Sequence, residues 1–407
     1  MKKIQPHSHM KSILSMNSKI IHKPRYLFVL ASSSQLYSGT GTAIFEWIKY
    51  ARNHFDFAIC IDNDNPYNYR IARTFCQDNG LPFLPSAPFA WDGGPDPGNA
   101  WASTHLNSGY WQLVEAVSWA NATLNHEIVD ACNSRVPIIY TPHTQPAWTM
   151  PNSDRYWALE GSFVRMLEAA SLICCDSPAE LETITDLAPG AKAKYIPIGV
   201  NTAEFCPSTD TRKSQILIVA DFNEKRKRTD LSLAAIDRLF SRSKLHSAVL
   251  AGKNSEHVSI PTSQEARILR AGYIDKQKLI ELYASSQLFL LLSDYEAFGI
   301  PIVEALSCGT PVVTTDTREA RSLFGNLPGC HLVDNTDENA VDAAIDRALQ
   351  ETDHLNISRS TANQFNLEAT FSLKMNAIQS ILNRLERPQS NMIGTQKHSK
   401  RSLSSLY

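Results

Sequence analysis

Short apolar segments alternate with longer amphipathic segments along most of this chain, and this alternation limits what it can fold into. Apolar runs of strand length separated by helix-length stretches are typical of parallel α/β sheets, in which helices cover the sheet between successive strands. The expected strands are 27–34, 56–61, 136–142, 171–177 and 193–200, followed by 214–222, 246–252, 266–274, 286–294 and 310–316. The expected helices of the second series are 229–240, 275–286, 300–308 and 338–350.

A chain of 407 residues is too long for one hydrophobic core, and the two series of strands predict two Rossmann-like domains. The sequence becomes polar and rich in turn-forming residues near 202–213, which indicates the join. We predict an N-terminal domain over 26–205, a C-terminal domain over 206–365, a terminal helix over 366–386 that packs back toward the N-terminal domain, and basic tails over 1–25 and 387–407.

Charge is distributed unevenly along the chain. The two tails carry ten Lys and Arg and no acid, which leaves 29 basic against 41 acidic residues in the body. The formal net charge of −2 gives no general attraction to nucleic acid. The tails could contact anionic lipid headgroups. The alternative is that they are solvated ends without a partner.

The cysteine pattern and the hydropathy indicate which cellular compartment the protein suits. Eight cysteines are scattered without a CxxC pair, which favours neither a zinc site nor a disulfide framework and fits a reducing cytosol. No apolar run approaches the roughly 20 residues that span a bilayer. We therefore expect a cytoplasmic protein, in peripheral contact with a membrane at most.

Two glutamates stand eight residues apart in "SDYEAFGIPIVEALSCGTPVV", residues 293–313. Glu296 follows the expected strand 286–294, at the strand end where open α/β sheets bind ligands. Pro301 suits a first helical position, so Glu304 is expected in or near the first turn of the next helix. A turn through Gly299 would bring both carboxylates to one ligand. From spacing alone, a solvated Glu296 and a first-turn acid at Glu304 remain an equal alternative.

This stretch resembles the E-x7-E segment of the retaining glycosyltransferases of family 4, which have the GT-B fold of two Rossmann-like domains facing a central cleft. Further similarity lies in "ASLICCDSPAELETI" (170–184), "YIPIGVNTAEFCP" (195–207) and "SCGTPVV" (307–313). The resemblance covers roughly residues 27–385. It implies that Glu296 holds donor-sugar hydroxyls, that Glu304 holds the ribose, and that the amides of Phe298, Gly299 and Ile300 approach the sugar and diphosphate.

The same resemblance assigns donor contacts elsewhere in the chain. The loop "SGTGTA" would place Gly39 and Gly41 against the donor phosphates, although a purely conformational turn is the alternative. His143 would lie near the donor sugar, where a structural or exposed histidine is the alternative. The residues expected near the nucleobase are Gly252, Tyr273 and Ile274.

Other positions depart from the family pattern or go beyond it. Lys227 matches the family lysine that neutralises the leaving diphosphate, but Phe222 occupies the usual arginine position, so Arg226 is a candidate substitute. A solvated basic run is the alternative for both cations. Glu319 lacks the glycine pair that normally precedes it. In the long segment 85–110, Trp91 and Trp101 could stack on an acceptor sugar, or serve as ordinary loop anchors.

The resemblance implies a retaining, metal-independent glycosyltransferase with no cofactor beyond a nucleotide-diphosphate sugar as co-substrate. The acceptor would be a hydroxyl of a sugar, a lipid-linked glycan or a protein, in glycan, polysaccharide or glycolipid synthesis. The alternatives are another GT-B-like enzyme, such as a sugar phosphorylase or a nucleotide-sugar epimerase, and a non-catalytic nucleotide-sugar-binding protein.

Overall fold

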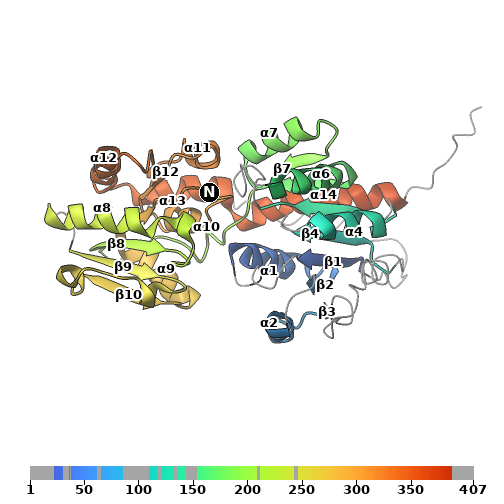
Figure 1. The fold of residues 1–407 in the computed structure, drawn as a ribbon, viewed down its shortest axis with the longest axis horizontal. Coiled ribbons are helices and arrows are strands. Elements are labelled where there is room, and N and C mark those ends of the chain that lie inside the picture. Colours follow the sequence, from blue (N-terminus) through green and yellow to red (C-terminus); the bar gives the residue numbers. More distant parts are fainter. Residues whose placement is uncertain are drawn as a thin grey trace, which may run out of the picture.

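A computed structural model describes residues 23–30, 36, 38–61, 66–85, 110–117, 122–132, 135–143, 154–208, 211–242 and 246–386. Within these residues the chain forms two lobes side by side, each built around a parallel β-sheet (Figure 1). The predicted basic tails lie almost wholly outside the described residues, as do Trp91 and Trp101. None of the described helices is long and apolar enough to cross a membrane.

The N-terminal lobe contains a seven-stranded sheet in the order β3-β2-β1-β4-β5-β6-β7, with parallel pairing throughout. Its strands are β1 Arg25–Leu30, β2 Asp56–Ile61, β3 Phe83–Pro85, β4 Leu113–Val117, β5 Ile138–Thr141, β6 Leu172–Cys175 and β7 Ala193–Tyr195. Its helices are α1 Gly39–Ala51, α2 Pro66–Asp78, α4 Ala122–Cys132, α6 Asp154–Ala169 and α7 Pro178–Leu187.

The C-terminal lobe contains a six-stranded parallel sheet in the order β10-β9-β8-β11-β12-β13. Its strands are β8 Lys213–Val219, β9 Ser247–Ala251, β10 Ile268–Gly272, β11 Ser286–Leu291, β12 Val312–Thr315 and β13 Cys330–Val333. Its helices are α8 Thr229–Ser241, α9 Lys276–Ser285, α10 Ile300–Ser307, α11 Arg318–Phe324, α12 Glu338–Ala348 and α13 His354–Phe365. The short 3-10 helices are Lys225–Lys227, Ser255–His257 and Thr262–Gln264.

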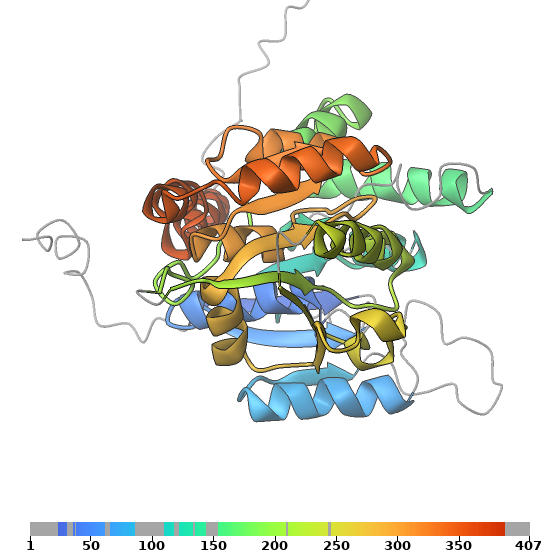
Figure 2. The ribbon, with the colours of Figure 1, turned by 90° about the vertical axis from the view of Figure 1, so that its left-hand side faces the viewer.

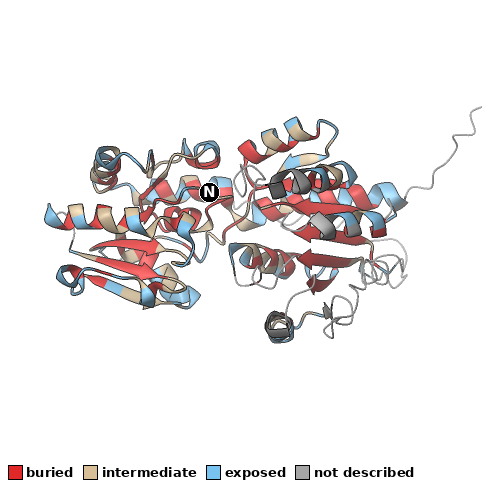
Figure 3. Ribbon diagram, viewed as in Figure 1, coloured by how far each residue is buried: buried red, intermediate tan, exposed pale blue. Residues whose placement is uncertain are grey.

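Most described strand residues are buried on both faces, whereas the helices expose their outer sides (Figure 3). This burial follows from helices covering each sheet on two sides, which requires near-continuous apolar strands such as "QLFLL" in β11 (Figure 2). In both sheets the strand order reverses next to the first strand, between β1 and β4 and between β8 and β11. Ligands of open α/β sheets bind at the carboxyl ends of the strands at such reversal points.

Helix α14, Leu367–Glu386, leaves the C-terminal lobe and runs along the N-terminal one (Figure 1). Phe371, Ile378 and Leu382 join the core that lies between α1 and the N-terminal sheet. A buried ion pair adds to this packing: Lys374 Nζ lies 2.8 Å from Glu115 Oε1 on β4. Glu115 also accepts hydrogen bonds from Tyr26 and Thr141, so its carboxylate is compensated from three sides.

We predict that Lys374→Met lowers the free energy of unfolding by about 3 kcal/mol, because it leaves the Glu115 carboxylate buried without a counter-charge. Urea unfolding followed by tryptophan fluorescence measures this loss. The double variant Lys374→Met/Glu115→Gln should recover most of it, since the amide oxygen still accepts from Tyr26 and Thr141. The control Lys49→Met removes an exposed pair with Glu46 and should change stability by well under 1 kcal/mol. Equal stability of Lys374→Met and Lys49→Met would contradict the prediction.

Candidate active site

The loops that follow β8 and β11 lie side by side at the reversal point of the C-terminal sheet. The loop after β8 contains the short helix Lys225–Lys227, and the loop after β11 contains Glu296. A backbone hydrogen bond of 2.8 Å from the amide of Asp294 to the carbonyl of Arg226 joins the two loops. The sheet therefore brings together two sequence motifs that are about 70 residues apart.

Glu296 is the centre of a compact charged cluster. Lys227 Nζ lies 2.7 Å from Glu296 Oε1, and Arg226 Nη1 lies 3.3 Å from Oε2. The hydroxyl of Ser293 donates a third hydrogen bond of 2.7 Å to Oε1. The side chains of Lys227 and Glu296 are only 9% and 14% exposed, so this part of the basic run is not a solvated surface.

The electrostatics of the cluster favour the charged forms of Glu296 and Arg226. Burial alone would raise the pKa of Glu296, but the charges of Lys227 and Arg226 and the hydrogen bonds they and Ser293 donate lower it below its ordinary value. For Arg226 the cost of burial is likewise outweighed, here by Glu296 and Glu224, and its pKa is raised. Glu224 also pairs with Arg226, so two cations face two carboxylates in this cluster, and an anionic ligand would compete with the carboxylates for Lys227 and Arg226.

Phe222 and Arg226 have different surroundings in the structure. Phe222 is partly buried and packs against the hydrophobic core beneath α8. Arg226 instead reaches the loop after β11, where it also donates to the carbonyl of Tyr295 at 3.2 Å. A cation is therefore present beside Glu296, although it comes from a backbone position four residues later than the family pattern places it.

Helix α10 begins directly after this cluster. Gly299 is its N-cap residue with a φ of 84°, a left-handed conformation that glycine adopts without strain. Phe298 turns its ring inward, where it packs edge-on against Phe324 and Phe365. The amides at the start of α10 follow Glu296 closely in the chain, and the N-terminus of a helix is a favourable position for an anion.

Glu304 is the fifth residue of α10, which begins at Ile300, so it lies directly after the first turn, in agreement with the expected position in or near that turn. Its side chain is buried and accepts a hydrogen bond of 3.1 Å from the hydroxyl of Tyr283 on α9. Burial raises the pKa of Glu304 to about 7, although the hydrogen bond from Tyr283 and the charge of Lys276 act in the opposite direction. Burial of Glu304 in its charged form therefore lowers the stability of the fold.

The start of α1 meets the start of α10 across the two lobes (Figure 1). A Cβ atom on Gly39 would lie 3.3 Å from Cδ1 of Ile300, so the side chain of Ile300 lies against the backbone at the start of α1. Gly41 is buried two residues further along α1. Two helix N-termini from different sheets therefore converge, and both carry partial positive charge.

The residues expected near the nucleobase lie at the ends of neighbouring strands. Gly252 follows β9 with a φ of 122°, and a Cβ there would meet the carbonyl oxygen of Ala220 at 2.1 Å. Its amide donates to the carbonyl of Gly272, which holds the ends of β9 and β10 together. Tyr273 is 80% exposed beyond this turn, and Ile274 packs partly into the core.

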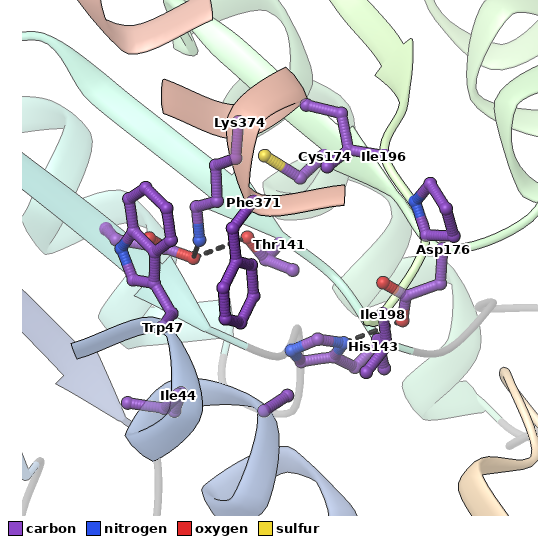
Figure 4. Close-up of a pocket in the computed structure, with 13 residues that line it drawn as sticks. Ile44, Trp47, Thr141, His143, Cys174, Asp176, Ile196, Ile198, Phe371 and Lys374 are labelled. Carbon is purple, nitrogen blue, oxygen red and sulfur yellow. Dashed lines mark hydrogen bonds and ion pairs between the residues drawn. The ribbon is translucent and has the colours of Figure 1, made fainter. Parts of the chain in front are cut away.

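His143 follows β5 of the other lobe and borders a cavity of about 40 Å³ (Figure 4). Its Nδ1 atom lies 2.7 Å from Oδ2 of Asp176, the residue after β6. The sequence did not single out Asp176, Glu115 or Lys374, which line the same cavity. Only Asp176 had a local signal, since it directly precedes the helix-start pattern Ser177-x-x-Glu180.

In the described part of the chain, no group of three or more His, Cys, Asp or Glu side chains has the arrangement of a metal site.

Residues 203–365 match the family described as "Glycosyl transferases group 1". The chain is 33% identical to O-antigen chain mannosyltransferase B of Escherichia coli over 119 residues, which are 28% of this chain and 31% of that protein. It is 25% identical to mannosylfructose-phosphate synthase of Agrobacterium fabrum over 250 residues, 52% of this chain and 53% of the relative. These matches thus span 31% and 53% of the relatives' lengths.

Solved structures match a larger share of the chain. Anabaena HepE in complex with UDP and glucose superposes with a TM-score of 0.69 at 17% identity, covering 88% of this chain and 100% of that one. Sucrose-phosphate synthase from Thermosynechococcus elongatus superposes with a TM-score of 0.67 at 17% identity, covering 89% and 100%. The protein therefore has the predicted GT-B fold, and residues 203–365 carry its similarity to the group 1 glycosyl transferases.

Proposed function

We propose that this protein is a retaining glycosyltransferase that moves a sugar from a nucleotide-diphosphate sugar to an acceptor hydroxyl. The observation that carries the proposal is the buried Glu296, Lys227 and Arg226 cluster next to the start of α10, with the start of α1 facing it. A diphosphate needs cations and free amides, and a sugar needs a hydrogen-bond acceptor. This cluster supplies all three.

The comparisons support a nucleotide-sugar donor. The names of the curated relatives describe mannosyl transfer and sugar-phosphate synthesis, and the matching HepE structures contain UDP, glucose or UDP-glucose. A panel of nucleotide sugars, described below, tests the donor's base and sugar. The acceptor in this proposal belongs to glycan, polysaccharide or glycolipid synthesis. The proposal includes no metal, because Lys227, Arg226 and the two helix starts can neutralise the diphosphate.

In the proposed reaction, the bond between the sugar C1 and the diphosphate oxygen breaks, and a bond from C1 to the acceptor oxygen forms on the same face. The acceptor proton passes to the leaving phosphate. Lys227 and Arg226 stabilise the negative charge that develops on the leaving group, which is the kind of contribution that dominates many active sites. Glu296 accepts hydrogen bonds from donor-sugar hydroxyls and also fixes the positions of both cations.

Glu304 completes the donor site from inside α10 by accepting the ribose hydroxyls. Burial raises the pKa of Glu304 to about 7 even though Tyr283 donates a hydrogen bond to it, so keeping a carboxyl group here costs stability. A role in binding the ribose hydroxyls would explain why the chain has one at this position. Carboxylate acceptors for ribose hydroxyls are the usual device at nucleotide sites of α/β sheets.

The proposal predicts that nucleotide sugars stabilise the folded protein and that Glu304 matters more than Glu296 for the bare nucleotide. A thermal-shift panel of UDP-glucose, GDP-mannose and ADP-glucose should show at least one clear increase in Tm. Titration calorimetry with the matching nucleoside diphosphate should then show about tenfold weaker binding to Glu304→Gln. Glu296→Gln should bind at least as well as the native protein, because its two cations are released toward the phosphates. Equal losses in both variants would contradict the division of roles.

Lys227→Ala should lower turnover by on the order of a hundredfold, as loss of a single electrostatic contact to a developing charge typically does. The rate of release of the nucleoside diphosphate from the donor found in the panel measures this effect. Lys225→Ala is the matched control, since Lys225 is exposed on the same short helix and should change turnover less than twofold. A larger effect at Lys225 than at Lys227 would show that a different cation serves the leaving group.

Glu304→Gln should raise the free energy of unfolding at pH 8.5 by on the order of 2 kcal/mol and leave it almost unchanged at about pH 4. The folded-state pKa of about 7 lies above the ordinary value of 4.5, so the native protein loses stability as the pH rises from 4.5 to 7. Gln resembles the protonated acid and avoids that loss. Urea unfolding at both pH values measures the difference, with the exposed Glu281→Gln as control. Lower stability of Glu304→Gln at pH 8.5 would contradict this account.

A further inference from the structure

The backbone at His143 adopts a conformation that most residues avoid. Its φ is 54°, in the left-handed region, at the point where the chain leaves β5. This conformation turns the imidazole toward the end of β6, where Nδ1 meets Oδ2 of Asp176 at 2.7 Å. The two side chains are 10% and 3% exposed. Strained backbone at a strand end of this kind is usually tied to a functional site.

Asp176 is itself fixed by the start of α7. Its backbone amide donates a hydrogen bond of 2.6 Å to Oε2 of Glu180, and the Glu180 amide donates to the hydroxyl of Ser177 at 2.9 Å. Ser177 is the N-cap of α7, so the helix points its positive end at this segment. The backbone of Asp176 therefore has a defined position at the start of α7.

The second ring nitrogen of His143 lies on the side of the imidazole away from Asp176, toward α1 and the cavity (Figure 4). The other ionisable groups that line the cavity are Glu115 from β4, Cys174 from β6 and Lys374 from α14. Glu115 and Lys374 pair with each other, and the Asp176 carboxylate pairs with His143. Each carboxylate thus has its own partner, and the walls contributed by Ile44 and Phe371 are apolar. An uncharged group with a hydroxyl suits this cavity better than an ion does.

We propose that Asp176 is a positioning residue that holds the Nδ1–H of His143 and thereby presents Nε2 to the cavity as a hydrogen-bond acceptor for a sugar hydroxyl. That the hydroxyl belongs to a sugar rests on the proposed function. The orientation of the imidazole does not depend on that proposal. In a neutral histidine only one nitrogen carries the proton, and the partner of that nitrogen decides which one it is. A carboxylate at Nδ1 selects the tautomer whose Nε2 lone pair is free to accept.

The tautomer can be measured without substrate. Nitrogen-15 NMR of the full chain labelled at histidine distinguishes the protonated from the unprotonated ring nitrogen, and a His143→Asn variant identifies the His143 signals among the 12 histidines. We expect an Nδ1–H tautomer in the native protein. In Asp176→Asn the side-chain amide can donate to Nδ1 as well as accept from it, so the preference for the Nδ1–H tautomer should be weakened.

Asp176→Glu keeps the carboxylate and should retain most of the Nδ1–H tautomer, whereas Glu182→Gln removes a carboxylate elsewhere on α7 and should leave the tautomer unchanged. An Nε2–H tautomer in the native protein, or the same tautomer populations in native and Asp176→Asn proteins, would overturn the proposal. Far-UV circular dichroism confirms that each variant is folded.

Turnover measurements then test whether the oriented His143 acts on a sugar hydroxyl. With the donor identified in the panel, Asp176→Asn should reduce kcat by about tenfold or more and leave the Kd of the nucleoside diphosphate unchanged, because His143 contacts the sugar and not the nucleotide. An unchanged kcat together with the predicted NMR result would reject a role toward the sugar hydroxyl. Failure of every donor in the panel would reject the proposed function while the NMR result still decides the orientation of His143.

Discussion

The chain passes between its two lobes twice, and the two passages hydrogen bond to each other. The amide of Val200 donates to the carbonyl of Phe365 at 2.9 Å, and the amide of Leu367 donates to the carbonyl of Val200 at 3.0 Å. Gly199 allows this approach, since a Cβ there would lie 2.2 Å from the hydroxyl oxygen of Thr370. The first crossing is thereby held against the second, and the loops of one sheet can face those of the other in a defined relation.

Behind the candidate site, one arginine holds the ends of two helices. The guanidinium of Arg212 donates to the carbonyls of Ser286 and Cys308 at 2.7 Å each, at the carboxyl ends of α9 and α10. Its burial lowers its pKa to about 10, but it satisfies carbonyls that the helices leave without partners. The contact of Arg212 with the carboxyl end of α10 therefore helps to fix the direction of the helix, and with it the position of its start, where the anion is expected. Helix α7 is used similarly: one end fixes Asp176, and Arg318 of the C-terminal lobe contacts Glu182 and Thr183 on its surface.

The local part of this architecture could be predicted from the sequence. Alternating apolar and amphipathic segments predicted both sheets, and the Gly299-Ile300-Pro301 turn predicted the start of α10. Strand β4 was missed because "LVEAV" carries Glu115 at its centre, where a strand buried on both faces normally has an apolar residue. Its partner Lys374, the only lysine of α14, lies 259 residues away. Pairings at that distance leave no periodic signal, so Glu115 and Lys374 could be found only in three dimensions.

The contribution of α14 to the N-terminal lobe has a consequence for biosynthesis. Part of the core beneath α1, and the counter-charge of Glu115, come from residues 371–382, close to the end of the described chain. A ribosome delivers these residues long after the strands they cover. The lobe that is synthesised first therefore cannot complete its core until residue 382 has emerged, whereas the sheet of the second lobe has all its described strands by residue 333. The order of synthesis and the order of completion are thus reversed in this chain.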